Sequence, residues 1–116
     1  MDGITKILDL EKLNYVAQLF IGEHNFSAFS KQDINKNPNR KIYNSKWVKK
    51  RDYFEYTITG NSFLRNMVRN LVGVQIAYCE DKVTYDEVSK NLLNPKKERL
   101  NFIAPPNGLV LWNVKY

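Results

Sequence analysis

Apolar side chains recur at three- and four-residue intervals over residues 10–21, which is the spacing of one face of a helix. The residues on this face are Leu10, Leu13, Val16, Ala17 and Phe20. Asp9 precedes them and is a favoured N-cap residue, and Gly22 follows them and favours a helix end. The pattern predicts a helix over residues 10–21, and the irregular segment 24–30 after it predicts a packed loop.

Two stretches in the middle of the chain, residues 41–49 and 53–59, are rich in aromatic and β-branched side chains and predict strands. In the second stretch apolar and polar residues alternate, which is the period of a strand with one buried face. The short charged segment 49–52 between them predicts a hairpin turn. Residues 109–116, Leu-Val-Leu-Trp-Asn-Val-Lys-Tyr, predict a final strand. The Asn- and Lys-rich segment 31–40 predicts an exposed loop.

Two further helices are predicted between these strands. Residues 62–78 carry a wide apolar stripe at helical spacing, formed by Phe63, Leu64, Met67, Val68, Leu71 and Val72. The other helix begins at Thr84, where Thr84 and Glu87 have the spacing of a capping box, and it ends before Pro95.

The element order α-β-β-α-α-β predicts a single α+β domain, an antiparallel sheet with helices packed on one face. Sheet edges that lack a neighbouring strand invite further pairing. Such a sheet therefore suits a domain that docks against another half.

The chain is basic, with 18 Lys and Arg against 12 Asp and Glu and a formal charge of +6. An excess of this size favours a polyanionic partner. Aromatic and basic residues also alternate around the predicted hairpin, for example Trp47, Lys49 and Tyr53. This interleaving suits RNA, in which phosphates attract cations and unstacked bases stack on flat side chains. By itself it is more typical of the solvated end of a hairpin, and both interpretations stay open.

Several functional classes are excluded by what the chain lacks. Cys79 and His24 are the single cysteine and histidine, so an intrachain disulfide and a Cys–His zinc site are ruled out. The amino-terminal residues do not resemble a secretory signal, and no apolar run approaches the length of a membrane span. We therefore expect a soluble, cytoplasmic protein without metal, cofactor or membrane contact. His24, flanked by phenylalanines, is expected to be a hydrogen-bonded packing residue and not a general base.

The predicted helix 62–78 has an unusual second face. Arg65 and Arg69 stand one turn apart, as do Asn66 and Asn70, and Gly73 continues the row from Arg69. A glycine within a helix costs about 1 kcal/mol relative to alanine. This row is either a solvated face or a surface that meets a phosphate or another backbone.

Four ordered segments resemble the tRNA pseudouridine synthase A family. The strongest is GNSFLRNMVRNLVG at residues 60–73, which resembles that family's Gly-Asn strand end and Met-Val-Arg-Asn helix. The others are IGEHNFSAFS at 21–30, PNRKI at 38–42 and APPNGLVLWNVKY at 104–116. Asn25 replaces the aspartate common in the second segment. The resemblance covers residues 10–116, the carboxyl-terminal half of such an enzyme.

The resemblance implies a two-half enzyme that isomerises uridine to pseudouridine in the anticodon stem-loop of tRNA. The catalytic aspartate of that family lies in the amino-terminal half within Gly-Arg-Thr-Asp, a string that this chain does not contain. By the same resemblance Arg69 pairs with that aspartate, Leu109 forms an apolar wall of the uridine pocket, and Arg65 and Arg40 contact phosphate or the cleft. The implied partners are tRNA, the amino-terminal half and a second copy in a homodimer. The competing hypothesis is a free-standing RNA-binding or dimerisation module without catalysis.

Overall fold

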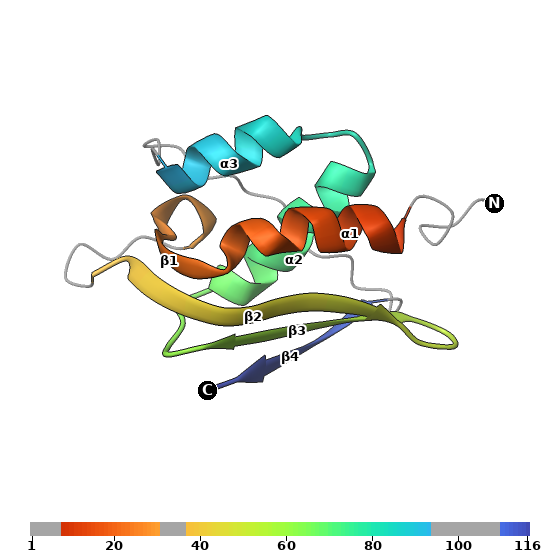
Figure 1. Ribbon diagram of the computed structural model, residues 1–116, viewed down its shortest axis with the longest axis horizontal. Helices are drawn as coiled ribbons and strands as arrows, with labels where there is room; N and C mark the ends of the chain where they lie inside the picture. The colour runs from red at the N-terminus through yellow and green to blue at the C-terminus, as the bar shows by residue number, and fades with distance from the viewer. Residues whose placement is uncertain (1–7, 31–36, 94–109) are drawn as a thin grey trace.

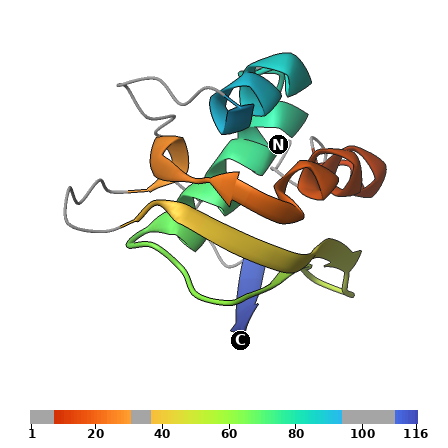
Figure 2. The same ribbon diagram turned by 60° about the vertical axis from the view of Figure 1, so that its left-hand side comes forward.

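The computed structural model describes residues 8–30, 37–93 and 110–116. Its elements are α1 (Leu10–Ala17), the 3₁₀ turn η2 (Gln18–Phe20), β1 (Gly22–Asn25), the 3₁₀ turn η3 (Ser27–Phe29), β2 (Asn39–Lys49), β3 (Phe54–Gly60), α2 (Met67–Cys79), α3 (Tyr85–Leu93) and β4 (Val110–Lys115). Figures 1 and 2 show two layers, with the helices packed over one face of the sheet. The predicted α+β class is confirmed. Leu109 and most of the predicted loop 31–40 lie outside the described residues.

Both predicted helix caps are confirmed. The Asp9 carboxylate accepts a hydrogen bond from the Glu11 backbone N–H at 2.9 Å, which satisfies one of the free donors at the start of α1. At α3 the capping box is complete. The Thr84 backbone N–H donates to Glu87 Oε1 at 3.0 Å, and the Glu87 N–H donates to Thr84 Oγ1 at 3.1 Å.

The sheet has four strands in the order β1-β2-β3-β4 and is mixed, so the expectation of a purely antiparallel sheet is wrong. The antiparallel pairs are β1–β2 and β2–β3, and β4 is parallel to β3, with Phe54 opposite Val110 and Thr59 opposite Lys115. The chain between β3 and β4 includes both α2 and α3. A crossover of this length returns the chain to the start of the sheet, which makes the next strand parallel.

The strand β1 occupies the first part of the segment 24–30 that was expected to be a packed loop. It pairs with the beginning of β2, from Gly22 opposite Ile42 to Asn25 opposite Asn39. Gly22 has φ +104°, a conformation that L side chains rarely adopt, and this residue turns the chain from the end of the first helical segment into β1.

The helix α2 begins five residues later than the predicted start at residue 62. Asn66 immediately before it is left-handed, with φ 62° and ψ 6°. Phe63 and Leu64 therefore pack against the core from a turn and not from a helix. Asn70 and Gly73 are buried, so the row that they form with Arg69 is not a solvated face. The middle of α2 is buried on every side, because the sheet and α1 both pack against it.

Polar side chains join the helical layer to the sheet inside the core. The Trp47 indole N–H donates to Gln75 Oε1 at 2.9 Å, and Gln75 Nε2 donates to the Leu71 carbonyl at 3.0 Å. The hydroxyl groups of Ser45 and Tyr56 lie 2.6 Å apart and share a hydrogen bond. Buried polar atoms cost free energy unless they are paired. The Trp47–Gln75 bond therefore fixes how α2 sits on the sheet, and the Ser45–Tyr56 bond joins β2 to β3 within it.

The side of β2 beyond its short pairing with β1 is covered by α1. The Trp47 backbone N–H donates to Asn14 Oδ1 at 2.8 Å, and Asn14 Nδ2 donates to the Trp47 carbonyl at 3.0 Å. One amide side chain therefore satisfies both main-chain groups of Trp47, as a neighbouring strand would.

Tyr56 gives the chain a predictable response to alkali. Burial is the main cause that raises its pKa from 10.0 to about 12. Folding thus favours the neutral phenol. The contribution of neutral Tyr56 to the free energy of unfolding is therefore fully present below pH 10 and is lost as the pH rises towards 12. A shift of this size corresponds to about 2–3 kcal/mol. We expect the free energy of unfolding of Tyr56→Phe to fall less steeply than that of the parent between pH 10 and 12. At neutral pH the substitution costs about 1 kcal/mol, because Ser45 loses its partner.

Urea titrations at each pH measure both effects. Tyr43→Phe is the matched control, since the Tyr43 side chain is 55% exposed. An alkaline dependence equal in all three proteins would contradict the burial argument.

Gly60 closes β3 where no larger residue fits. A Cβ atom there would lie 2.9 Å from Ile42 Cδ1 and 3.0 Å from the Lys41 carbonyl oxygen. We expect Gly60→Ala to reduce the free energy of unfolding by about 1–3 kcal/mol, because the backbone oxygen cannot move without disturbing the β2–β3 pairing. Thr59→Ala, one residue earlier on the other face, is expected to cost less than about 1 kcal/mol. Equal unfolding midpoints for the two variants would show that the strands do not approach this closely.

Candidate functional site

The carboxyl ends of β3 and β4 and the first turn of α2 lie at the same end of the molecule (Figure 1). The connection from Gly60 to Asn66 lies between β3 and α2. The Phe63 ring in this connection meets the Tyr116 ring edge-on, with centroids 5.4 Å apart. The family-like segment 60–73 and the end of the chain therefore come together in space.

Asn61 ties this connection to the start of β2. Its backbone N–H donates to the Lys41 carbonyl at 3.1 Å, and its side-chain oxygen accepts from the Lys41 N–H at 3.0 Å. Asn61 thus extends the hydrogen bonding between β2 and β3 by one residue beyond Gly60, the last residue of β3. The chain then turns towards α2 from a fixed position.

Arg69 lies in the first turn of α2 and is exposed, and Arg65 is exposed in the turn before it. The two arginines are not on successive turns of one helix as predicted, because the left-handed Asn66 separates them. Asparagine tolerates this conformation better than most residues. Within the described ranges neither arginine takes part in an ion pair. Both guanidinium groups therefore remain able to meet an anion.

Arg40 lies near the start of β2, at the same end of the sheet. Its Nη1 donates to the carbonyls of Asn37 at 2.6 Å and Asn39 at 2.7 Å. Its Nε is buried and has no hydrogen-bond partner among the described residues. The loop holds Arg40 in place, next to the end where Arg65 and Arg69 are found. The sequence-predicted site residues Arg40, Arg65 and Arg69 thus share one end of the molecule. The fourth, Leu109, lies outside the described residues, and Val110 after it is opposite Phe54, at the other end of β3 from Gly60.

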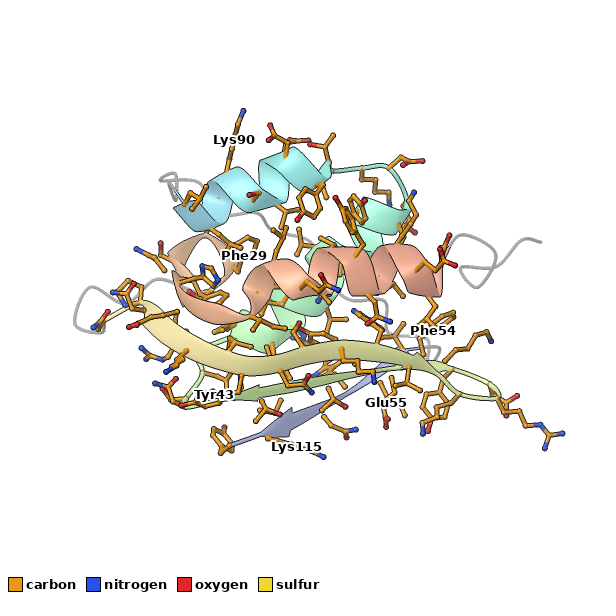
Figure 3. All side chains as sticks on the ribbon, in the orientation of Figure 1. Phe29, Tyr43, Phe54, Glu55, Lys90 and Lys115 are labelled. Carbon is orange, nitrogen blue, oxygen red and sulfur yellow. The ribbon has the colours of Figure 1, made fainter. Side chains whose placement is uncertain are left out.

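The face of the sheet opposite the helices carries polar and basic side chains. In the described part of the chain no helix covers this face, and Figure 3 shows Glu55 and Lys115 on it. The pairing register sets three rows across the strands: Asn44–Thr59–Lys115, Lys46–Thr57–Asn113 and Val48–Glu55–Leu111. We call these nine residues the open face.

The open face was not identified from the sequence. Lys46 and Lys115 are exposed on it, and the Asn113 amide donates to Glu55 Oε2 at 2.9 Å. The alternation that predicted β3 places Glu55, Thr57 and Thr59 on one face, and the β2–β3 register then places Lys46 opposite Thr57 on the same face. The position of Lys115 depended on the parallel pairing of β4, which the alternation did not reveal.

His24 is a packing residue, as predicted. Its Nε2 lies 2.8 Å from the Ile21 carbonyl, and its ring meets the Phe26 ring edge-on with centroids 5.8 Å apart. Asn25, which replaces the aspartate of the resembling family, still accepts a hydrogen bond from the Ser27 N–H at 2.9 Å through its side-chain oxygen. This turn needs only an acceptor, so an amide serves as well as a carboxylate.

Neither a metal centre nor a membrane-spanning helix is found in residues 8–30, 37–93 and 110–116. Over these ranges no three His, Cys, Asp or Glu residues are grouped so that they could hold a metal ion. Over the same ranges no helix is both long and apolar enough to cross a membrane.

The sequence profile of the tRNA pseudouridine synthase family matches residues 16–116. The chain is 39% identical over 111 residues to tRNA pseudouridine synthase A of Malacoplasma penetrans (strain HF-2), which covers 96% of this chain and 46% of that protein. It is 39% identical over 109 residues to the Staphylococcus aureus (strain JH1) protein of the same name, and this match covers 93% of this chain and 41% of that protein. The chain thus spans less than half the length of these curated relatives. Because the profile covers most of its length, this chain belongs to the tRNA pseudouridine synthase family.

Proposed function

We propose that this chain is the carboxyl-terminal half of a tRNA pseudouridine synthase and completes its active site. The amino-terminal half supplies the catalytic aspartate, and together they isomerise uridine in the anticodon stem-loop of tRNA. The observation that carries this proposal is Arg69, an exposed arginine on the first turn of an otherwise buried helix, within the segment that most resembles the family. A rigid helix with one solvent-facing cation is a suitable support for a catalytic pair.

In this proposal Arg69 acts on the aspartate of the other half. A carboxylate nucleophile must be ionised to attack, and a guanidinium within about 4–6 Å lowers the pKa of a carboxyl group. The planar guanidinium can also bond both carboxylate oxygens and so orient the group. The uridine is turned out of the RNA, its glycosidic bond is cleaved, and the base is rejoined through carbon.

The other residues of the site bind and position RNA. Arg65 and Arg40 are the proposed phosphate contacts, and Leu109 is the proposed apolar wall beside the uracil. The lysines of the open face extend the positive surface across the sheet. Phosphate contacts of this kind fix the position of the RNA but carry no base specificity themselves.

The edge strand β4 is the proposed contact with the amino-terminal half. Only one side of β4 is paired in the described structure, and Leu111 and Val114 on it are 49% and 37% exposed. The opposite edge, β1, has four residues and lies against α3. The longer and more apolar edge is better suited to continue the sheet into a second half. A second copy of the chain could occupy the same edge in a homodimer.

The proposed division of labour predicts that this chain alone forms no pseudouridine in unmodified tRNA. The joined protein, in which the chain follows the amino-terminal half of the Malacoplasma penetrans relative, is expected to form it. Release of tritium from tRNA labelled at uridine C5 measures the activity of the chain alone and of the joined protein. Turnover by the chain alone would contradict the proposal. An inactive joined protein that folds and binds tRNA would favour the free-standing RNA-binding module.

Arg69→Ala is expected to reduce turnover of the joined protein by about 10²–10³-fold, because breaking a buried charge pair costs roughly 3–5 kcal/mol. In the chain alone, where Arg69 is exposed, the free energy of unfolding should change by no more than about 0.5 kcal/mol. Arg51→Ala, an exposed arginine in the hairpin turn, is the matched control and should leave turnover unchanged. A chain destabilised by several kcal/mol together with normal turnover would disprove the catalytic role.

The open face predicts weak, salt-sensitive binding of tRNA by the chain alone. Each neutralised phosphate releases counterions, so affinity falls as salt rises. We expect the double substitution Lys46→Ala with Lys115→Ala to reduce the slope of log Kd against log salt by about 1–2. Lys82→Ala with Lys90→Ala is the control on the helical side, where Figure 3 shows Lys90 pointing away from the sheet. Equal slopes for the two double variants would show that RNA does not bind the open face.

A further inference from the structure

Asn70 is a buried amide directly next to the exposed Arg69. The Asn70 side chain is 4% exposed, and its Nδ2 donates to the Phe29 carbonyl at 3.0 Å. Asn70 and Phe29 are 41 positions apart in the sequence. This bond therefore joins the first turn of α2 to the 3₁₀ turn η3.

The Asn70–Phe29 bond satisfies two groups that would otherwise be costly to bury. Met67 and Leu71, the neighbours of Asn70 along the same side of α2, are fully buried hydrophobic residues. An amide among them is unfavourable unless it is hydrogen-bonded. Phe29 is the last residue of a short helix, where carbonyl groups lack partners within the helix. The bond is thus a tertiary link between two family-like segments, 21–30 and 60–73.

The turn that carries Arg69 is joined to the preceding residues by main-chain hydrogen bonds: the Met67 N–H donates to the Leu64 carbonyl at 3.1 Å, and the Asn70 N–H donates to the Asn66 carbonyl at 3.0 Å. Its N-cap residue, Asn66, is left-handed and makes no side-chain capping hydrogen bond. The helix begins at Met67, so the side-chain bond of Asn70 is a tertiary contact made within the first turn.

We infer that Asn70 is a positioning residue that sets the direction of Arg69 towards the aspartate of the other half. This inference depends on the catalytic role proposed for Arg69. A guanidinium stands roughly 8 Å from the axis of its helix, so a 10° rotation of the turn moves it by roughly 1–1.5 Å. A displacement of about 1 Å at a reacting centre can reduce the rate about 10²-fold. Fixing the rotation of this turn is therefore a catalytic requirement.

The test is a double-mutant cycle in the joined protein. Asn70→Ala is expected to reduce kcat at least tenfold and to change KM less than twofold. In an Arg69→Lys background, which keeps the charge but not the fixed guanidinium geometry, the same substitution should reduce kcat less than threefold. Asn70→Ser is the second variant. Its hydroxyl can bond its own helix and keep the fold, but it cannot reach Phe29.

Asn14→Ala is the matched control, since Asn14 also links distant segments through two backbone hydrogen bonds and lies on α1. It should lower the urea midpoint at least as much as Asn70→Ser and leave kcat within twofold. Equal losses of kcat for the Asn70 variants in the parent and in the Arg69→Lys background would overturn the inference. A normal kcat for Arg69→Ala would instead overturn the proposed role of Arg69.

Discussion

The burial of α2 against the sheet is the constraint on which the other elements depend. From Asn70 to Ala77 each residue of this helix is buried. Gln75 bonds the Trp47 indole from within it, so the helix cannot rotate without leaving polar atoms unpaired. With α1 packed against the same helix, one face of the sheet is filled, and none of the described helices covers the opposite face (Figure 1).

With the role proposed for Arg69, this arrangement separates the residues for stability from those for function along a single helix. The middle of α2 supplies core contacts, and its exposed first turn supplies Arg69. A cation placed on the first turn of a packed helix has a well-defined backbone position. The Asn70–Phe29 bond lies at the boundary between these two parts. Substitutions on either side of it are therefore expected to separate into those that alter folding and those that alter turnover.

Much of the fold could be predicted from local patterns, and the failures have physical causes. The period of apolar residues and the caps at Asp9 and Thr84 identify α1 and α3 because these signals act within one turn. The strand β1 has the sequence Gly-Glu-His-Asn, which has little intrinsic strand preference and exists only because β2 pairs with it. The left-handed Asn66 was not predicted, because the apolar spacing of Phe63 and Leu64 continues that of α2 although both residues lie in the turn before it. For the site, Arg69, Arg65 and Arg40 were accessible through the resemblance, while the open face required the pairing register.

The chemistry of the edge strand explains how an open sheet edge can select its partner. An edge that exposes Leu111 and Val114 would invite pairing with any extended chain. On β4 these residues are interrupted by Asn113 and followed by Lys115, and a lysine on an edge disfavours unselective pairing. A partner strand that places a carboxylate or an amide opposite Lys115 avoids the cost of leaving this charge without a partner. Lys115, which belongs to the open face, therefore also restricts which sheet can join this one, so in the proposed enzyme RNA binding and pairing of the two halves depend on overlapping residues.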